Sequence, residues 1–190
     1  SLVTHTIVTN GVKTTKDETV EISTGGRLST TGTGAKLSAV KLAARDAELI
    51  VKAGDLTVNA DSTATADADK IVAINDTASG AVNVADGAAL LVNGNISGTA
   101  TLNVDGAMTM GKVTQNKVEA DAWVNAHALN VAATGVYTAA GKTTLATSSQ
   151  VLGTATFGVL DLTNATHTLS VGSSTAAVGG HATINNLMKG

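Results

Sequence analysis

The chain has 190 residues, of which 43 % are hydrophobic, a proportion that supports a folded domain with a core. Its net charge is −3 and its lysines and arginines are scattered, which argues against a nucleic-acid partner because no basic patch would contact phosphates. No apolar run approaches the roughly 20 residues of a membrane helix, so we expect no membrane insertion.

Aromatic residues are nearly missing from the sequence, which has one Trp, one Tyr and one Phe, and it has no proline. A wide globular core normally draws on aromatic side chains, because each one buries roughly 150–250 Å². This composition therefore favours a narrow interior filled by Val, Leu, Ile, Ala and Met. Without proline, every backbone N–H can donate a hydrogen bond, which favours a chain made largely of continuous strand ladders.

The Thr-rich residues 1–34 predict two or three short strands, with turns at Asn10-Gly11 and Gly25-Gly26. We expect this segment to be an arm or cap, and residues 35–190 to form the main domain. The first strand is free of charge apart from His5, so nothing in it blocks pairing with a neighbouring subunit. The interface residues predicted there are Leu2, Val3, Thr4, Thr6, Ile7 and Val8.

Residues 36–54, "KLSAVKLAARDAELIVKAG", carry two periodicities. Polar side chains recur at helical spacing, and Gly54 would serve as a C-terminal cap. Apolar residues also alternate on either side of a break at Arg45-Asp46. We favour two strands, because the following "DLTVNA" is typical of a strand, and keep the helix as the alternative.

A short apolar–polar–apolar triplet followed by a turn signal recurs along the chain. Four such triplets begin at Leu56, Val82, Leu102 and Leu129, at similar but unequal intervals, and a further one begins at Leu169. These intervals suit an irregular stack of repeats, in which neighbouring units bury their apolar faces jointly. The pattern predicts an all-β, irregular parallel β-solenoid, with a β-sandwich or jelly roll as the alternative.

Residues 118–128, "VEADAWVNAHA", alternate strictly between small apolar and other residues, which predicts one strand with a buried face. Trp123 falls on the polar side of this alternation. A tryptophan among polar side chains often marks an interface, so Trp123 is a further candidate for subunit contact.

Near the C-terminus, "HATINNL" predicts another strand with no charge except on His181. Strands at the edges of monomeric proteins usually carry Lys, Pro or inward-pointing charge that prevents pairing. Because this strand has none of them from Gly180 to Leu187, we predict that Ile184 and Leu187 also lie in a subunit interface.

The sequence offers no group of residues suited to catalysis. None of the four histidines, His5, His127, His167 and His181, has a partner at metal-ligand spacing. The acidic run of Asp61, Asp67 and Asp69 lacks the pattern of a calcium loop and predicts a solvated loop. No carboxylate pair suits glycoside hydrolysis, and no phosphate-binding loop or nucleophile elbow is present. We therefore expect no enzyme activity, no metal and no cofactor.

The segments "LTVNADS", "VNVADGAALLVNGN" and "TLNVDGAMT" resemble the irregular coils of bacterial extracellular β-solenoid proteins, the autotransporter passenger domains and related adhesins. The resemblance covers residues 37–190 and implies a secreted structural or adhesive protein. This chain is shorter than most passengers and no membrane-anchoring barrel follows it, which suggests a small subunit that polymerises.

These observations predict a self-assembling structural protein outside the cell or at the cell surface. It would form a filament, sheath or surface layer whose subunits join by strand addition, so the expected partner is a second copy of the chain. An adhesin that binds a glycan, a host protein or another cell-surface component is one alternative, and a phage or virus structural component is another.

Overall fold

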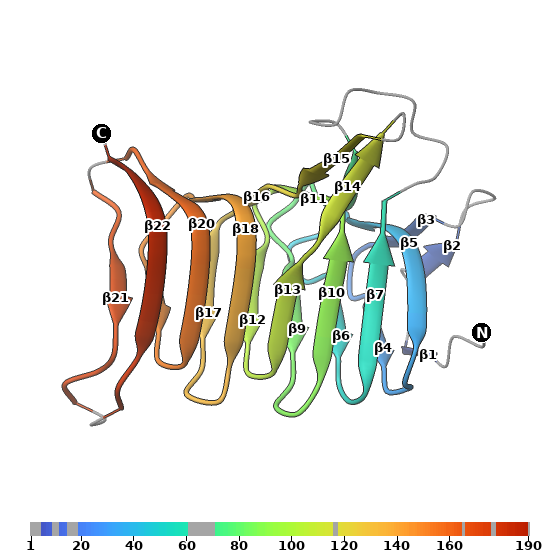
Figure 1. Ribbon diagram of the computed structural model, residues 1–190. Coiled ribbons are helices and arrows are strands. Elements are labelled where there is room, and N and C mark those ends of the chain that lie inside the picture. Colours follow the sequence, from blue (N-terminus) through green and yellow to red (C-terminus); the bar gives the residue numbers. More distant parts are fainter. Residues whose placement is uncertain are drawn as a thin grey trace.

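The computed structural model describes residues 5–8, 12–14, 19–60, 71–115, 118–164, 166–175 and 178–189. Within these ranges the chain contains strands and no helix, so the protein is all-β (Figure 1). The expected dominance of strand is confirmed. It follows from the many Val and Thr residues, whose branched side chains suit a pleated surface, and from turns at short intervals.

Among the described residues the strands form two large sheets and one hairpin. The eight-stranded sheet contains β1 (His5–Val8), β4 (Arg27–Thr30), β6 (Glu48–Val51), β9 (Ala81–Val84), β12 (Thr101–Val104), β17 (Ala128–Val131), β19 (Ser149–Val151) and β21 (Leu169–Val171). The twelve-stranded sheet contains β2 (Val12–Thr14), β3 (Thr19–Ile22), β5 (Ala35–Leu42), β7 (Asp55–Asn59), β8 (Val72–Asp76), β10 (Ala89–Asn93), β11 (Asn95–Gly98), β13 (Ala107–Met110), β16 (Val124–Ala126), β18 (Val136–Leu145), β20 (Thr154–Leu162) and β22 (His181–Lys189). The hairpin joins β14 (Lys112–Gln115) to β15 (Val118–Asp121).

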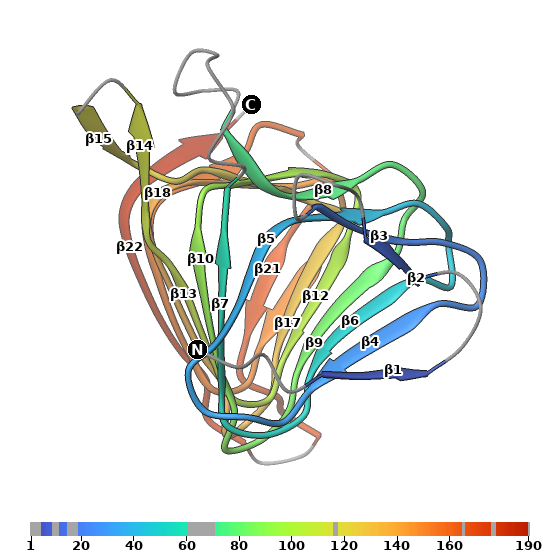
Figure 2. The same ribbon diagram turned by 90° about the vertical axis from the view of Figure 1, so that its right-hand side faces the viewer.

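Most strand pairs in both large sheets are parallel. After each strand of the eight-stranded sheet except the last, the chain passes through the twelve-stranded sheet and then returns to the eight-stranded sheet one strand further along, a circuit that we call a pass. Viewed end-on, the successive strands surround a common interior (Figure 2). Parallel strands require such crossover connections, which here are other strands rather than helices.

Three complete passes of the chain have the same length. They run from Ala81 to its partner Thr101, from Asn130 to its partner Gln150, and from Ser149 to its partner Leu169. Two further passes are longer. The pass that includes residues 61–70 separates β6 from β9, and the pass that includes the β14–β15 hairpin separates β12 from β17. The irregular spacing in the sequence therefore comes from insertions into a shorter basic repeat.

The interior consists of rows of apolar side chains that run across the strands. One row in the eight-stranded sheet is entirely buried and contains Leu49, Val82, Leu102 and Leu129. A second row places Tyr137 beside Met108 and Ala155 in the twelve-stranded sheet. Aliphatic residues fill most of the core, as the composition predicts. The two single-ring aromatic side chains, Tyr137 and Phe157, contact each other with ring centroids 5.5 Å apart.

The register confirms part of the predicted repeat and corrects the rest. Val82, Leu102 and Leu129 occupy one row, as the recurrence of their triplets predicts. Leu56 does not belong to that row, because it lies in β7 and pairs with Leu90 of β10. The partner of Val82 on the preceding pass is Leu49. The triplet at Leu56 therefore marks a different wall of the same interior.

Residues 36–54 form strands and not a helix. β5 ends at Leu42, a connection includes Arg45 and Asp46, and β6 begins at Glu48, so the favoured prediction is confirmed. The single strand predicted over residues 118–128 is wrong. The segment is divided among β15, β16 and the start of β17. Its alternation survives in part, because Ala122, Val124, Ala126 and Ala128 are all buried.

The N-terminal segment pairs with the strands that follow it. β1 lies antiparallel to β4, β3 lies parallel to β5, and β4 pairs with β6. Gly25 has a positive φ of 68° in the turn predicted at Gly25-Gly26. The turn at Asn10-Gly11 lies outside the described residues. A separate arm or cap over residues 1–34 stays a prediction.

Candidate functional site

The C-terminal strands leave a set of core positions uncovered. Ile184 and Leu187 of β22 pair with Phe157 and Leu160 of β20, which are both completely buried. One strand further along, Ile184 is 36 % exposed and Leu187 is 40 % exposed. Val171 of β21 is 47 % exposed, although its partner on β19 is buried. The rows of the core therefore continue to the end of both sheets and remain open there.

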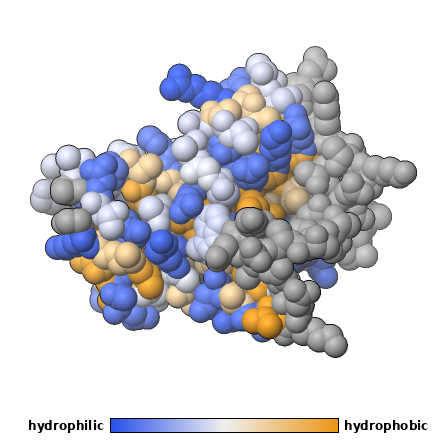
Figure 3. Space-filling view, turned by 90° about the horizontal axis from the view of Figure 1, so that it is seen from above, coloured by the Kyte–Doolittle hydropathy of each residue, from blue (hydrophilic) through white to orange (hydrophobic). Residues whose placement is uncertain are grey.

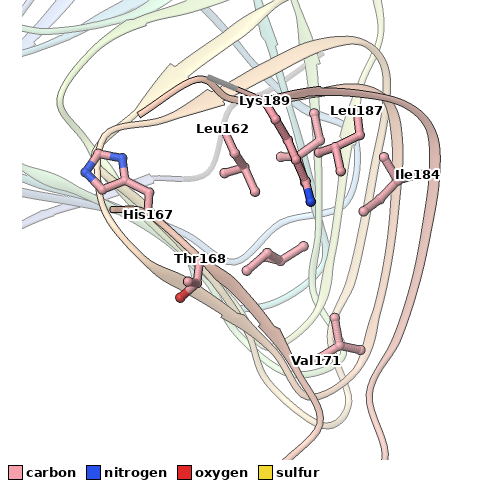
Figure 4. A pocket seen from close by; sticks show the side chains of 9 residues that line it. Leu162, His167, Thr168, Val171, Ile184, Leu187 and Lys189 are labelled. Atoms are coloured by element: carbon pink, nitrogen blue, oxygen red, sulfur yellow. The ribbon is translucent and has the colours of Figure 1, made fainter. Parts of the chain in front are cut away.

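These side chains line a hollow of about 440 Å³, which we call the terminal hollow. Figure 4 shows the side chains of Leu162, Ile184 and Leu187 directed into the space between the last strands. The residues that line it are Leu160, Leu162, His167, Thr168, Leu169, Val171, Ile184, Leu187 and Lys189. Its wall is mainly aliphatic because it is the cross-section of the core itself. It is suited to packing against apolar groups.

The strands that border the terminal hollow also carry backbone groups at an edge. β21 and β22 are the last strands in the order of their sheets, and each has a single neighbouring strand. An edge strand presents N–H and C=O groups that can pair with a further strand. From His181 to Met188 the sequence of β22 contains no Asp, Glu, Lys or Arg. The edge therefore offers backbone pairing with few charges to oppose it.

Lys189 is the charged residue of this surface that the sequence analysis missed. It belongs to β22, pairs with Leu162, and extends its side chain into the terminal hollow (Figure 4). An inward-pointing charge is one of the devices that weaken pairing at an edge strand. The prediction stopped at Leu187, just before this lysine.

The predicted N-terminal interface residues are only partly within the described chain. Leu2, Val3 and Thr4 lie outside the described residues. Thr6, Ile7 and Val8 belong to β1, whose backbone pairs with β4 of the same chain. β1 is the first strand of the eight-stranded sheet, and β21 is the last. The C-terminal candidates Ile184 and Leu187 lie next to β21, in β22 at the end of the twelve-stranded sheet, so the N-terminal and C-terminal candidates are far apart in the order of the strands.

Trp123 is not part of either end. It lies between β15 and β16, and β18 and β20 separate β16 from β22 in the sheet. Its side chain is half-buried and lines a second hollow of 460 Å³ together with Asp121, Asn125 and Lys142. Trp123 is thus brought together with polar residues rather than with Ile184 and Leu187.

The described residues contain no group of three or more His, Cys, Asp or Glu side chains arranged to hold a metal ion. His127 and His181 are exposed and His167 is half-buried. The side chain of His5 and the acidic run of Asp61, Asp67 and Asp69 lie outside what the structure describes.

In the part of the chain that the structure describes, no helix is long and apolar enough to cross a membrane. The surface seen from above mixes polar residues with small apolar patches (Figure 3). Comparison with protein families, with curated proteins and with solved structures finds no match to this chain.

Proposed function

We propose that the protein is a β-solenoid that assembles with copies of itself, as the structural subunit of a filament, sheath or surface layer outside the cell. The observation that carries this proposal is the terminal hollow, where core residues such as Ile184 and Leu187 are exposed beside the edges of β21 and β22. Exposed apolar surface next to unpaired strand edges is a surface that another chain can cover.

The solenoid architecture is supported by the parallel pairing and by passes of equal length, such as those that begin at Ala81 and Ser149. Sandwiches and jelly rolls, the alternative folds, are built from antiparallel sheets. Rows of like residues across successive passes are what stacked repeats produce, since each repeat buries its apolar face against the next. The proposal of a location outside the cell rests on the resemblance to extracellular repeat proteins.

A second copy is the occupant that this surface fits best. Ile184 and Leu187 continue rows of the core in register with Phe157 and Leu160, so another pass of similar sequence would extend these rows. Strand addition would supply backbone hydrogen bonds along β21 and β22, and burial of Ile184, Leu187 and Val171 would supply hydrophobic stabilisation. If the joined surfaces differ on the two copies, the assembly extends as an open fibre.

Sedimentation velocity and negative-stain microscopy of the purified chain over a range of concentrations test the proposal. We expect oligomers or filaments, and we expect Ile184→Lys and Leu187→Lys each to weaken association by about tenfold or more, because each would bury an unpaired charge. Val118→Lys is the matched control, since Val118 is 66 % exposed on the β14–β15 hairpin and away from the terminal hollow.

Discrete monomers at every concentration would contradict self-assembly. Deletion of residues 1–10 tests whether the N-terminal strand or the terminal hollow joins the subunits. If that deletion abolishes association and Ile184→Lys leaves it intact, the N-terminal strand joins the subunits and the terminal hollow does not.

A further inference from the structure

The hollow at Trp123 combines an aromatic residue with polar residues, as small-molecule sites do, and thus differs from the mainly aliphatic terminal hollow. Its lining consists of Asp121, Trp123, Asn125 and Lys142, and it measures 460 Å³; we call it the Trp123 hollow. Asp121 ends β15 of the hairpin, Asn125 belongs to β16 and Lys142 belongs to β18. Polar residues from three neighbouring elements therefore line this hollow together with the one tryptophan of the sequence.

The backbone at Trp123 is held on both sides. Its N–H donates to Oδ1 of Asn95 over 2.9 Å, and its carbonyl oxygen accepts from the N–H of Ile96 over 3.0 Å. Asn95 and Ile96 are both completely buried. The tryptophan is thus presented by a fixed segment, which lowers the conformational entropy that a ligand would have to remove on binding.

A glycine in β18 permits the close approach that forms the hollow. A Cβ atom on Gly141 would lie 2.4 Å from the carbonyl oxygen of Ala122, the residue before Trp123. The register continues this contact, because Val124 pairs with Thr143. Trp123, which directly precedes β16, therefore lies beside Lys142 of β18.

The charges around the hollow cancel in pairs. Asp121 forms an ion pair with Lys112, and Lys142 lies 3.7 Å from Oδ2 of Asp161. Both charged residues of the lining, Asp121 and Lys142, are thus already paired, so neither is left to attract a ligand of opposite charge. Carboxylate, amide and ammonium groups remain well suited to hydrogen bonds with hydroxyl groups.

The half-buried Trp123 borders this hollow, and an indole ring offers a flat apolar face with negative charge density that attracts the weakly positive C–H groups of a ring stacked on it. Surrounding hydrogen-bonding groups fix the orientation of a ligand that carries hydroxyl groups at its rim. A neutral pyranose has both features, an apolar C–H face and a polar rim. We propose that the Trp123 hollow binds a neutral sugar ring of a glycan. This inference does not depend on self-assembly, because β18 and β20 separate β16 from β22.

Tryptophan fluorescence provides a direct test, because the sequence contains a single tryptophan. The probes are neutral tetrasaccharides of glucose, galactose, mannose and N-acetylglucosamine, with tetragalacturonate as the charged comparison. We expect at least one neutral probe to change the fluorescence of Trp123 saturably, with a Kd of about 0.1–1 mM. Tetragalacturonate is expected to bind at least fivefold more weakly than its neutral galactose counterpart, because its carboxylates would lose water while Lys112 and Lys142 are already paired with Asp121 and Asp161.

Calorimetric titration of variants assigns the effect to named side chains. Trp123→Ala should abolish binding, Asn125→Ala should weaken it about tenfold, and Trp123→Phe should retain part of it because a ring remains. Circular dichroism should be unchanged in all three, since these side chains are not in the core. The Leu187→Lys variant should bind as the unaltered chain does, which separates this site from assembly.

Absence of saturable binding to every neutral probe would overturn the proposal. Equal binding by Trp123→Ala and the unaltered chain would overturn it too. Loss of self-association in Trp123→Ala, without any sugar binding by the unaltered chain, would show that the Trp123 hollow is a protein–protein contact.

Discussion

The hydroxyl groups of Tyr137 and Thr143 share a hydrogen bond of 2.9 Å inside the core. Both residues belong to β18 and both are completely buried. The ring of Tyr137 also contacts the ring of Phe157, so its apolar part packs in the core while its hydroxyl group has a hydrogen-bond partner. A buried hydroxyl group without such a partner would be strongly destabilising.

This pair predicts a non-additive response to mutation. Tyr137→Phe leaves the Thr143 hydroxyl group without its partner, and Thr143→Val does the same to the Tyr137 hydroxyl group. Each change should lower the free energy of unfolding by about 1–3 kcal/mol. The double variant should cost less than the sum of the two, because neither polar group is then left alone. Urea denaturation of all four proteins measures the coupling, and strictly additive losses would contradict the expected pairing.

The same tyrosine predicts a loss of stability in alkali. Burial raises the pKa of Tyr137 well above its ordinary value, and the hydrogen bond with Thr143 lowers it by less. The folded protein therefore holds the neutral phenol, whereas the unfolded chain releases the proton at about pH 10. Stability from this group is complete below that pH and falls above it by about 1.4 kcal/mol per pH unit.

Urea midpoints measured from neutral pH to about pH 11 will show this fall. Tyr137→Phe is the control, since it removes the only phenol in the sequence and should flatten the alkaline part of the curve. An unchanged slope in that variant would assign the alkaline loss to lysines instead.

A ladder of asparagine side chains runs across the outward face of the eight-stranded sheet. Nδ2 of Asn103 donates to Oδ1 of Asn83 over 2.8 Å, and Nδ2 of Asn130 donates to Oδ1 of Asn103 over 3.0 Å. Asn103→Asp removes the donor in the middle and places a carboxylate against the Asn83 oxygen. We expect a loss of about 1 kcal/mol in unfolding free energy. Thr101→Asp adds the same charge to the same strand outside the ladder and should cost less.

Gly158 marks a position where β20 and β18 approach too closely for a side chain. A Cβ atom there would lie 1.7 Å from the carbonyl oxygen of Ala140. Gly158→Ala should therefore destabilise the protein by about 3 kcal/mol or more, because backbone must move to relieve the overlap. Gly179→Ala is the control, since no atom lies within 4 Å of its Cβ position. Thermal unfolding followed by circular dichroism compares the two, and similar melting temperatures would refute the expected difference.

The position of Lys189 predicts that a substitution at this residue can strengthen self-association through the terminal hollow. Its side chain extends among Ile184 and Leu187, so a partner that covers the hollow must also desolvate its ammonium group. Lys189→Met removes that cost and should strengthen self-association by about tenfold in sedimentation velocity. Lys52→Met removes a charge from an exposed connection and should have no such effect. Weaker association of Lys189→Met would instead indicate that the lysine pairs with an acidic group of the partner.

Local sequence was sufficient for the strand character and for several boundaries. Alternating Val, Leu and Thr residues can satisfy a pleated, half-buried strand without reference to distant parts of the chain. The break at Arg45-Asp46 and the row of Val82, Leu102 and Leu129 follow from spacing alone. The composition also indicated the aliphatic interior, because few aromatic side chains were present to fill it.

Tertiary structure decided which wall each strand joins. The triplets at Leu56 and Val82 have the same pattern, yet they occupy different sheets, because any strand with an apolar face can line any wall of the interior. The segment from 118 to 128 is divided among three strands while its inward side chains stay buried. An alternating sequence does not reveal where one strand ends and the next begins.

Exposure at the terminal hollow depended on position in the stack and not on residue type. The sequence by itself indicated that Ile184 and Leu187 belong to a strand with few charges, and their pairing with Phe157 and Leu160 in the folded chain places both of them at the interior. The sequence also determined that Trp123 lies on the polar side of its segment. Only the folded chain decided that the first pair remains uncovered and that Asp121 and Lys142 gather around the tryptophan. The physical reason is that burial in stacked strands comes from the neighbouring pass, and this neighbour is set by register across the chain rather than by the local sequence.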